Sequence, residues 1–190
     1  MKKTLVLIAC LSVAFCAYAQ EFSVPKDYKL VFAEDYPLYD QDILKAIDWL
    51  QNTPVIDQKT KRKEVNTFLI KWLTGCPYVH LSIGNVAYAL LENKESQNLM
   101  IFIGGWVKYA LENKLFKENL KAIGDDTDYL VKGNLAGVDA VINFYEKNKK
   151  WTDKNAGVEK YIKMKKKGTL NDYVKKIVEK EKDAEKIKMK

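Results

Sequence analysis

The sequence is poor in the residues that build metal and redox sites. Histidine occurs once among 190 residues, and two of the three cysteines lie within the first twenty residues. A single histidine and a single later cysteine, Cys76, exclude the common zinc sites with two histidines or several cysteines, CxxC redox chemistry and c-type haem attachment. One thiol cannot form an internal disulfide, so the chain after residue 20 must be stabilised by packing. We expect Cys76 itself to be buried.

Extreme composition and long apolar runs are also absent. Hydrophobic residues make up 47% of the chain and charged residues 30%, values that argue against general disorder, a collagen-like repeat and a polytopic membrane protein. The apolar stretch from Leu5 to Phe15 is shorter than the roughly 20 residues that span a bilayer core. The length suits one domain with a hydrophobic core of its own.

Residues 1–19 have the three parts of a secretory signal peptide. Two lysines precede the apolar stretch, and Ala17-Tyr18-Ala19 supplies the small residues of a cleavage site. Cleavage before Gln20 predicts an exported protein, periplasmic or extracellular, in which no transmembrane segment remains. The alternative is a lipoprotein acylated at Cys10, but the apolar segment continues past that residue.

Charge divides the remaining chain into two regions. Residues 20–145 hold 14 basic and 17 acidic residues, whereas residues 146–190 hold 16 basic and 8 acidic residues. The first region is therefore expected to be the main helical domain, with an extended arm at its N-terminal end. The second region is expected to form basic C-terminal helices that pack on the same domain.

Seven lysines of the second region are candidates for contact with an anionic surface. Phosphate groups of an anionic lipid or of lipopolysaccharide would suit them, whereas nucleic acid is not expected for an exported protein. The alternative is an ordinary solvated surface, because acidic residues are interspersed and arginine is absent after Arg62. The candidate residues are Lys147, Lys149, Lys150, Lys163, Lys165, Lys166 and Lys167.

Apolar residues recur at helical spacing through most of the chain after residue 40. The pattern predicts an all-α fold, a single-domain bundle of about six or seven helices. Alternation of apolar residues leaves room for a short extended or β element near 28–32 and 79–83. Asp40, Ser96 and Asp126 are suitable N-caps. The expected helices cover approximately 40–52, 65–75, 86–93, 97–113, 126–145, 158–168 and the residues from 169 onward.

Four glycines lie inside two of the expected helices. Gly104 and Gly105 interrupt an almost wholly apolar helix, at about 1 kcal/mol each relative to alanine. Gly133 and Gly137 are four residues apart on the helix that follows residue 126. We expect the two helices to approach closely at these glycines.

Four aromatic residues could line an apolar cavity for a small ligand or a lipid. They are Trp72, Phe102, Trp106 and Tyr109, and such residues are also common in plain hydrophobic cores.

Evidence for catalysis is slight. Cys76 and His80 are four residues apart, but nucleophilic catalysis by cysteine also needs a group that orients the histidine, and none is identifiable. Asp125, Asp126 and Asp128 lack the glycine of a calcium-binding loop and suit the start of a helix better. We therefore expect no metal or cofactor, and a hydrolase built on Cys76 or on carboxylates is a remote alternative.

Three segments resemble uncharacterised small secreted helical proteins of Gram-negative bacteria. They are Leu99 to Leu111, Gly137 to Tyr145 and Val158 to Gly168. The resemblance implies an exported helical protein without an assigned activity. The leading hypothesis is a non-enzymatic protein that binds a partner protein or a component of the cell envelope, and the alternative is a carrier of a small apolar ligand or lipid.

Overall fold

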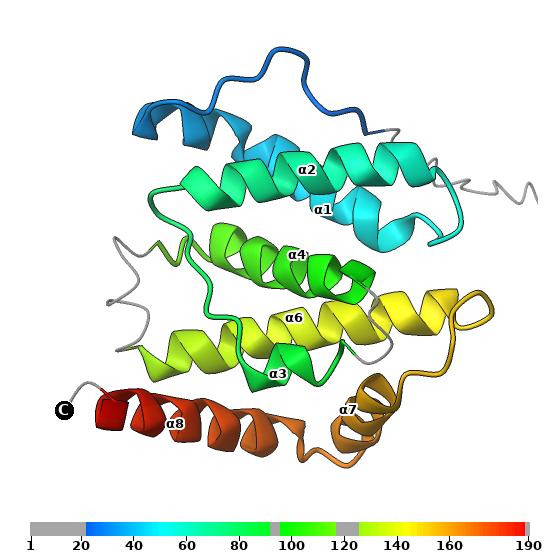
Figure 1. Ribbon diagram of the computed structural model, residues 1–190, viewed down its shortest axis with the longest axis vertical. Coiled ribbons are helices and arrows are strands. Elements are labelled where there is room, and N and C mark those ends of the chain that lie inside the picture. Colours follow the sequence, from blue (N-terminus) through cyan, green and yellow to red (C-terminus); the bar gives the residue numbers. More distant parts are fainter. Residues whose placement is uncertain (1–21, 92–95, 117–125, 189–190) are drawn as a thin grey trace, which may run out of the picture.

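The structure is a helical bundle, as the sequence predicts. The computed structural model describes residues 22–91, 96–116 and 126–188, so the expected signal peptide lies outside the described residues. Within these ranges the chain forms seven α-helices and one 3-10 helix and no strand (Figure 1). The elements are η1 (Ala33–Tyr39), α1 (Asp40–Asn52), α2 (Lys59–Gly75), α3 (Asn85–Tyr88), α4 (Ser96–Glu112), α6 (Thr127–Asn148), α7 (Ala156–Lys166) and α8 (Leu170–Lys188).

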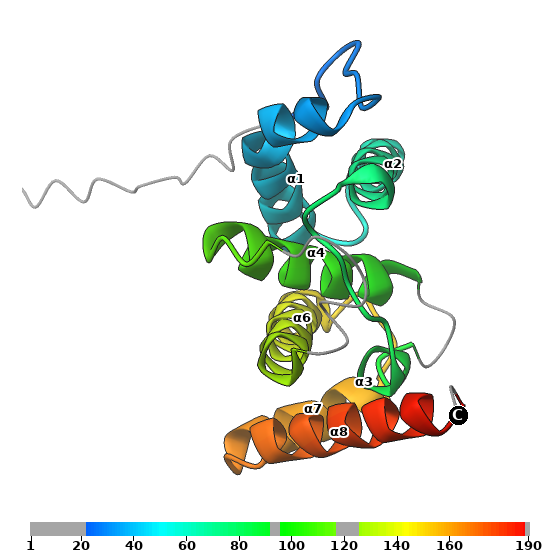
Figure 2. The same cartoon turned by 90° about the vertical axis from the view of Figure 1, so that its left-hand side faces the viewer.

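The helices are stacked in three layers. The outer layer at one side contains η1, α1 and α2, the middle layer contains α4 and α6, and the layer at the opposite side contains α3, α7 and α8 (Figures 1 and 2). α4 contacts α1 and α6, and α6 contacts α7 and α8. Each helix can therefore bury an apolar stripe against a neighbour, which is how an amphipathic helix gains most of its stability.

The close approach of α4 and α6 confirms the expectation from the glycines. A Cβ atom added to Gly105 would lie 2.6 Å from the Cβ of Ala140 and 3.1 Å from the Cα of Gly137. A Cβ atom added to Gly137 would lie 2.7 Å from the ring of Phe102. Only glycine leaves the room that this crossing requires.

Neither of the two segments with alternating apolar residues is a strand. Residues 28–32 are irregular, and residues 79–83 form an irregular connection from α2 to α3. A strand needs a hydrogen-bonded neighbour, whereas 79–83 contacts α6, where the hydroxyl of Tyr129 donates to the carbonyl of His80 at 2.9 Å. The helix expected from residue 86 is also short, because α3 ends at Tyr88.

The starts of two helices show one correct and one incorrect cap prediction. Asp126 caps α6, and its carboxylate accepts from the backbone N–H of Tyr129 at 2.9 Å. Asp40 is the first residue of α1 and not its cap, which is Tyr39. The Asp40 carboxylate instead accepts from the hydroxyl of Tyr78 at 2.5 Å, so a tertiary partner has replaced the local backbone.

α7 is joined to the rest of the bundle by buried polar contacts. The hydroxyl of Tyr161 on α7 donates to the carbonyl of Val86 at 3.1 Å. The side chain of Asn155, the N-cap of α7, donates to the carbonyl of Leu90 at 3.1 Å.

The boundary at residue 146, where the net charge of the sequence changes from negative to positive, lies inside α6. Among the described residues, every helix is too short or too polar to cross a membrane.

Candidate functional site

Three of the four candidate cavity residues belong to the hydrophobic core. Trp72, Phe102 and Trp106 are completely buried. Phe102 and Trp106 pack edge to face with ring centroids 6.1 Å apart, whereas Trp72 packs on the ring of Tyr78 and its indole N–H donates to the carbonyl of Tyr36 at 3.1 Å. Tyr109 is half-buried. The three buried rings fill the core.

Cys76 is buried, as predicted, in surroundings that suppress its reactivity. Its exposed fraction is 3%, and burial raises the pKa of the thiol. Burial is also the largest cause that raises the pKa of the neighbouring Asp40 carboxyl, which Tyr78 contacts. Because the thiolate is the nucleophile, a protonated and enclosed thiol cannot readily attack a substrate. Among the hydrogen bonds of the described residues, none joins Cys76 to His80.

The acidic residues at the start of α6 have structural partners. Asp126 caps the helix, and the carboxylate of Asp128 forms an ion pair with Lys132 at 2.8 Å. Asp125 lies outside the described residues. In the part of the chain that the structure describes, no three His, Cys, Asp or Glu residues are grouped as metal ligands would be.

The seven candidate lysines lie along the C-terminal end of α6, the following turn and α7. α7 packs beside α6 (Figure 1), and all seven lysines are exposed. Lys163, Lys166 and Lys167 share one side of the end of α7, because residues three and four apart are neighbours on a helix. They form no ion pair with any other described residue. We call these seven lysines together with Trp151 the basic end.

The other four lysines have partners of several kinds. Lys149 and Lys165 form ion pairs with Glu159 and Asp139 at 2.8 Å and 2.7 Å. The ammonium of Lys147 donates to the side-chain oxygen of Asn52 at 2.7 Å. The ammonium of Lys150 lies 4.0 Å from the ring centroid of Trp151, a residue that is 37% exposed. Three of these contacts leave most of the positive charge unneutralised. The side chain of Asn52 and the ring of Trp151 carry no negative charge, and the exposed ion pair of Lys165 is weak in water.

Hydrogen bonds hold Lys149 and the helix end beside it. Glu159 accepts from both Lys149 and the hydroxyl of Tyr145, and these two bonds lower the pKa of its carboxyl. The hydrogen bond to Glu159 in turn raises the pKa of Lys149. The residue before Lys149 is Asn148, and its side-chain oxygen accepts from the backbone N–H of Val55 at 2.7 Å. This bond ties α6 to the turn between α1 and α2.

Arg62 on α2 forms hydrogen bonds with the same turn. Its guanidinium donates to the carbonyls of Leu50, Thr53 and Pro54 at 3.1, 2.7 and 3.2 Å. It also lies near the ring of Phe144 on α6, 5.7 Å from the centroid. Burial lowers the pKa of this guanidinium, although arginine stays charged in proteins.

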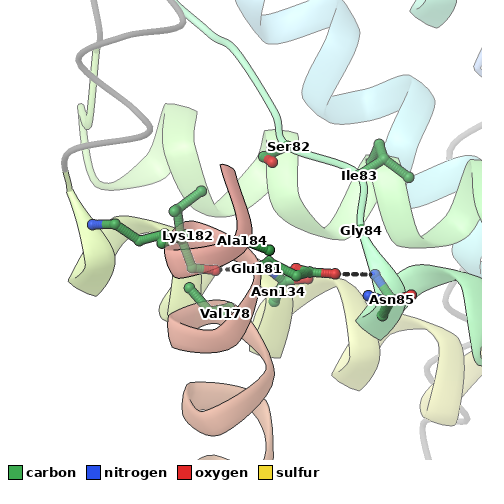
Figure 3. A pocket seen from close by; sticks show the side chains of 10 residues that line it. Ser82, Ile83, Gly84, Asn85, Asn134, Val178, Glu181, Lys182 and Ala184 are labelled. Atoms are coloured by element: carbon green, nitrogen blue, oxygen red, sulfur yellow. Dashed lines mark hydrogen bonds between the residues drawn. The ribbon is translucent and has the colours of Figure 1, made fainter. Parts of the chain in front are cut away.

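A pocket of about 320 Å³ lies at the opposite end of α6. Its walls come from the segment before α3, the first half of α6 and the second half of α8 (Figure 3). Sequence patterns do not reveal this site, because its residues are ordinary in type and far apart along the chain. Its lining residues include Gly84, Leu130, Asn134, Val178, Glu181, Lys182 and Ala184.

Comparison with protein-family models, with curated proteins and with solved structures finds no match to this chain.

Proposed function

We propose that this chain is an exported, non-enzymatic binding protein that attaches to an anionic component of the cell envelope through its basic end. The observation that carries the proposal is the side of α7 formed by Lys163, Lys166 and Lys167. These three exposed ammonium groups share one side of a helix without a carboxylate partner among the described residues. Lys165 lies on the same turn beside Asp139, and Lys147, Lys149 and Lys150 lie at the C-terminal end of α6.

The physical basis is attraction between the ammonium groups and phosphate groups. Each lysine near an anionic membrane surface contributes about 1 kcal/mol, within a Debye length of the surface. Trp151, partly exposed beside Lys150, adds an aromatic ring of the kind that favours the headgroup region of a bilayer. Asn148 and Arg62 tie the C-terminal end of α6, which carries Lys147, to the turn between α1 and α2.

A carrier of apolar ligands receives less support. Trp72, Phe102 and Trp106, the residues expected to line its cavity, fill the core, and the pocket at the other end of α6 is lined by different residues.

The test is cosedimentation of the purified protein with lipid vesicles. We expect binding to phosphatidylglycerol vesicles, little binding to phosphatidylcholine vesicles, and a steep loss of binding between about 50 and 200 mM salt. A charge-reversal variant with Lys163→Glu, Lys166→Glu and Lys167→Glu should lose more than about 100-fold in affinity, because three favourable contacts become unfavourable.

A second charge-reversal variant serves as the matched control. Lys176, Lys180 and Lys186 are exposed on α8, and their replacement by glutamate changes the net charge by the same amount. This variant should retain most of the vesicle binding. Equal losses in the two variants, or a flat response to salt, would show that the basic end is not a binding surface.

A further inference from the structure

The pocket at the other end of α6 is built from three segments that are distant in sequence. Asn134 on α6 and Glu181 on α8 are two of its lining residues, and Gly84 lies next to α3. Its volume of about 320 Å³ is within the range of small-molecule sites, about 300–1,000 Å³. Ser82, Asn85 and Lys182 are further polar residues of the lining, and its apolar side chains are Ile83, Leu130, Val178 and Ala184.

Asn134 brings an unused hydrogen-bond acceptor to this pocket. Only 4% of the residue is exposed, and its side-chain N–H group donates to the carbonyl of Leu130 at 2.8 Å. Its side-chain oxygen has no hydrogen-bond partner among the described residues. The amide cannot be reversed, because its oxygen would then face the carbonyl of Leu130.

Asn148 shows what the same side chain does when the chain supplies a donor. Its N–H group donates to the carbonyl four residues earlier at 2.8 Å, as that of Asn134 does. Its oxygen, however, accepts from the backbone N–H of Val55 at 2.7 Å. Buried polar atoms are nearly always paired, so the unpaired oxygen of Asn134 marks a place for a donor from outside the chain.

Glu181 supplies a carboxylate to the same pocket. One of its oxygens accepts from the backbone N–H of Asn85 at 2.6 Å (Figure 3). A Cβ atom added to Gly84 would lie 2.6 Å from each carboxylate oxygen, so the glycine lets the carboxylate lie against the backbone. The second oxygen has no hydrogen bond with another described residue.

Lys182 lines the pocket without neutralising Glu181. Its ammonium donates to the hydroxyl of Thr127 at 2.6 Å, and Figure 3 shows it extending away from Glu181. No ion pair between the two residues is formed. Ser82 and Asn85 add side chains that can donate as well as accept. The carboxylate of Glu181 is therefore the anionic group at the pocket, and the oxygen of Asn134 is an acceptor without a partner among the described residues.

We propose that this pocket binds a small organic ammonium ion with an apolar body. The ammonium group donates to the carboxylate of Glu181 and to the side-chain oxygen of Asn134, and the apolar body contacts Leu130 and Val178. Charge-assisted hydrogen bonds of this kind are about twice as strong as neutral ones. The proposal does not depend on the basic end, which would take ligands of the opposite charge.

The test is a titration of the purified protein followed by amide NMR, with phenethylammonium as the probe. We expect saturable shifts of the backbone amides of Gly84 and Asn85 and of the side-chain amide of Asn134. Phenethyl alcohol and hydrocinnamate, which have the same ring but a neutral or an anionic head, should cause no such shifts. Tighter binding of hydrocinnamate, equal binding of the alcohol or no binding of the amine would each overturn the proposal.

Variants identify the group that recognises the charge. Glu181→Gln should weaken phenethylammonium binding about tenfold, whereas Asp183→Asn removes a carboxylate from an exposed position of α8 and should leave it unchanged. Ala184 is an exposed lining residue, so Ala184→Phe blocks the pocket without disturbing the core and should abolish binding. Unchanged affinity in Ala184→Phe would contradict the proposal even if Glu181→Gln failed to fold.

Discussion

The two ends of α6 show how the same side chain can have different consequences. Asn148 and Asn134 are both buried, and each donates to the carbonyl four residues earlier. At the Asn148 end the turn before α2 supplies the donor for the side-chain oxygen, through Val55. At the Asn134 end the corresponding oxygen has no donor among the described residues.

The difference shows which end of α6 supplies a donor for its buried asparagine oxygen and which end does not, among the described residues. At the Asn148 end, both polar groups of the asparagine side chain form hydrogen bonds within the chain, and exposed lysines carry ammonium groups into solvent. The Asn134 end has a pocket with a carboxylate and an unpaired oxygen. The two ends are therefore expected to select ligands of opposite charge, although they belong to one helix.

The largest expected effect comes from the crossing that holds both ends in place. In Gly105→Val the new side chain would overlap Ala140 and the backbone of Ala136 on α6. We expect the free energy of unfolding to fall by about 3 kcal/mol, measured by urea denaturation, and both binding activities to weaken together.

Gly104→Ala is the control for this variant. Its added Cβ would lie 3.2 Å from the side chain of Ile47, and the gain in helix propensity is about 1 kcal/mol. We expect little net change in stability. Equal losses in the two variants would show that contact with α6 is not what requires glycine at position 105.

The second largest effect should follow from removal of Arg62. Arg62→Met removes the donor of the Leu50 and Thr53 carbonyls, whereas the carbonyl of Pro54 keeps the backbone N–H of Asp57 at 3.0 Å. We expect a loss of about 2 kcal/mol in the free energy of unfolding. Hydrogen exchange should increase in the turn between α1 and α2 but not around the pocket. Wild-type stability in this variant would mean that, in the unmodified protein, the cost of burying the charged guanidinium equals the gain from its hydrogen bonds.

A matched pair of substitutions tests the two asparagines directly. Asn148→Leu leaves the N–H of Val55 unpaired, so we expect a loss of about 1–2 kcal/mol in the free energy of unfolding. Asn134→Leu removes an oxygen that has no partner among the described residues, so its effect on stability should be below about 0.5 kcal/mol. Similar losses at both positions would remove the distinction between the two ends.

The smallest effect on stability is expected at Glu159. Lys149 and Tyr145 lower the pKa of this carboxyl from its ordinary value of 4.5. The ionised form is therefore favoured in the folded protein, and its contribution to stability is present above pH 4.5 and lost as the pH falls through the lowered pKa. Glu159→Gln should remove this dependence, as measured by thermal unfolding across the acidic range.

The same variant also affects the basic end. Glu159→Gln releases Lys149 from its ion pair, so binding to phosphatidylglycerol vesicles should tighten a few-fold. An unchanged affinity would show that Lys149 does not contact the lipid.

Much of the fold could be predicted because it rests on local patterns. Apolar spacing predicted the all-α class, Thr53 and Pro54 predicted the end of α1, and Asp126 predicted the start of α6. The glycines of α4 and α6 predicted a close crossing, because a small side chain inside a helix requires a packing reason. The resemblance to secreted proteins of Gram-negative bacteria, the signal peptide and export remain predictions.

Other features could not be predicted because they depend on distant partners. The alternation in 79–83 is typical of a strand, but no second strand lies beside it among the described residues. Asp40 has the sequence position of a cap, yet Tyr78 draws its carboxylate into a tertiary hydrogen bond. The four aromatic candidates could have lined a cavity or filled the core, and sequence spacing does not distinguish these outcomes.

By itself the sequence determined the helices, the burial of Cys76 and the concentration of lysines after residue 146, since each depends on composition or on neighbours within a few residues. The tertiary structure alone decided that Asn148 meets Val55 while Asn134 lies at a pocket with Glu181. The physical reason is that helical spacing determines which face of a helix is buried. Whether a buried oxygen finds a donor depends on a residue from another part of the chain.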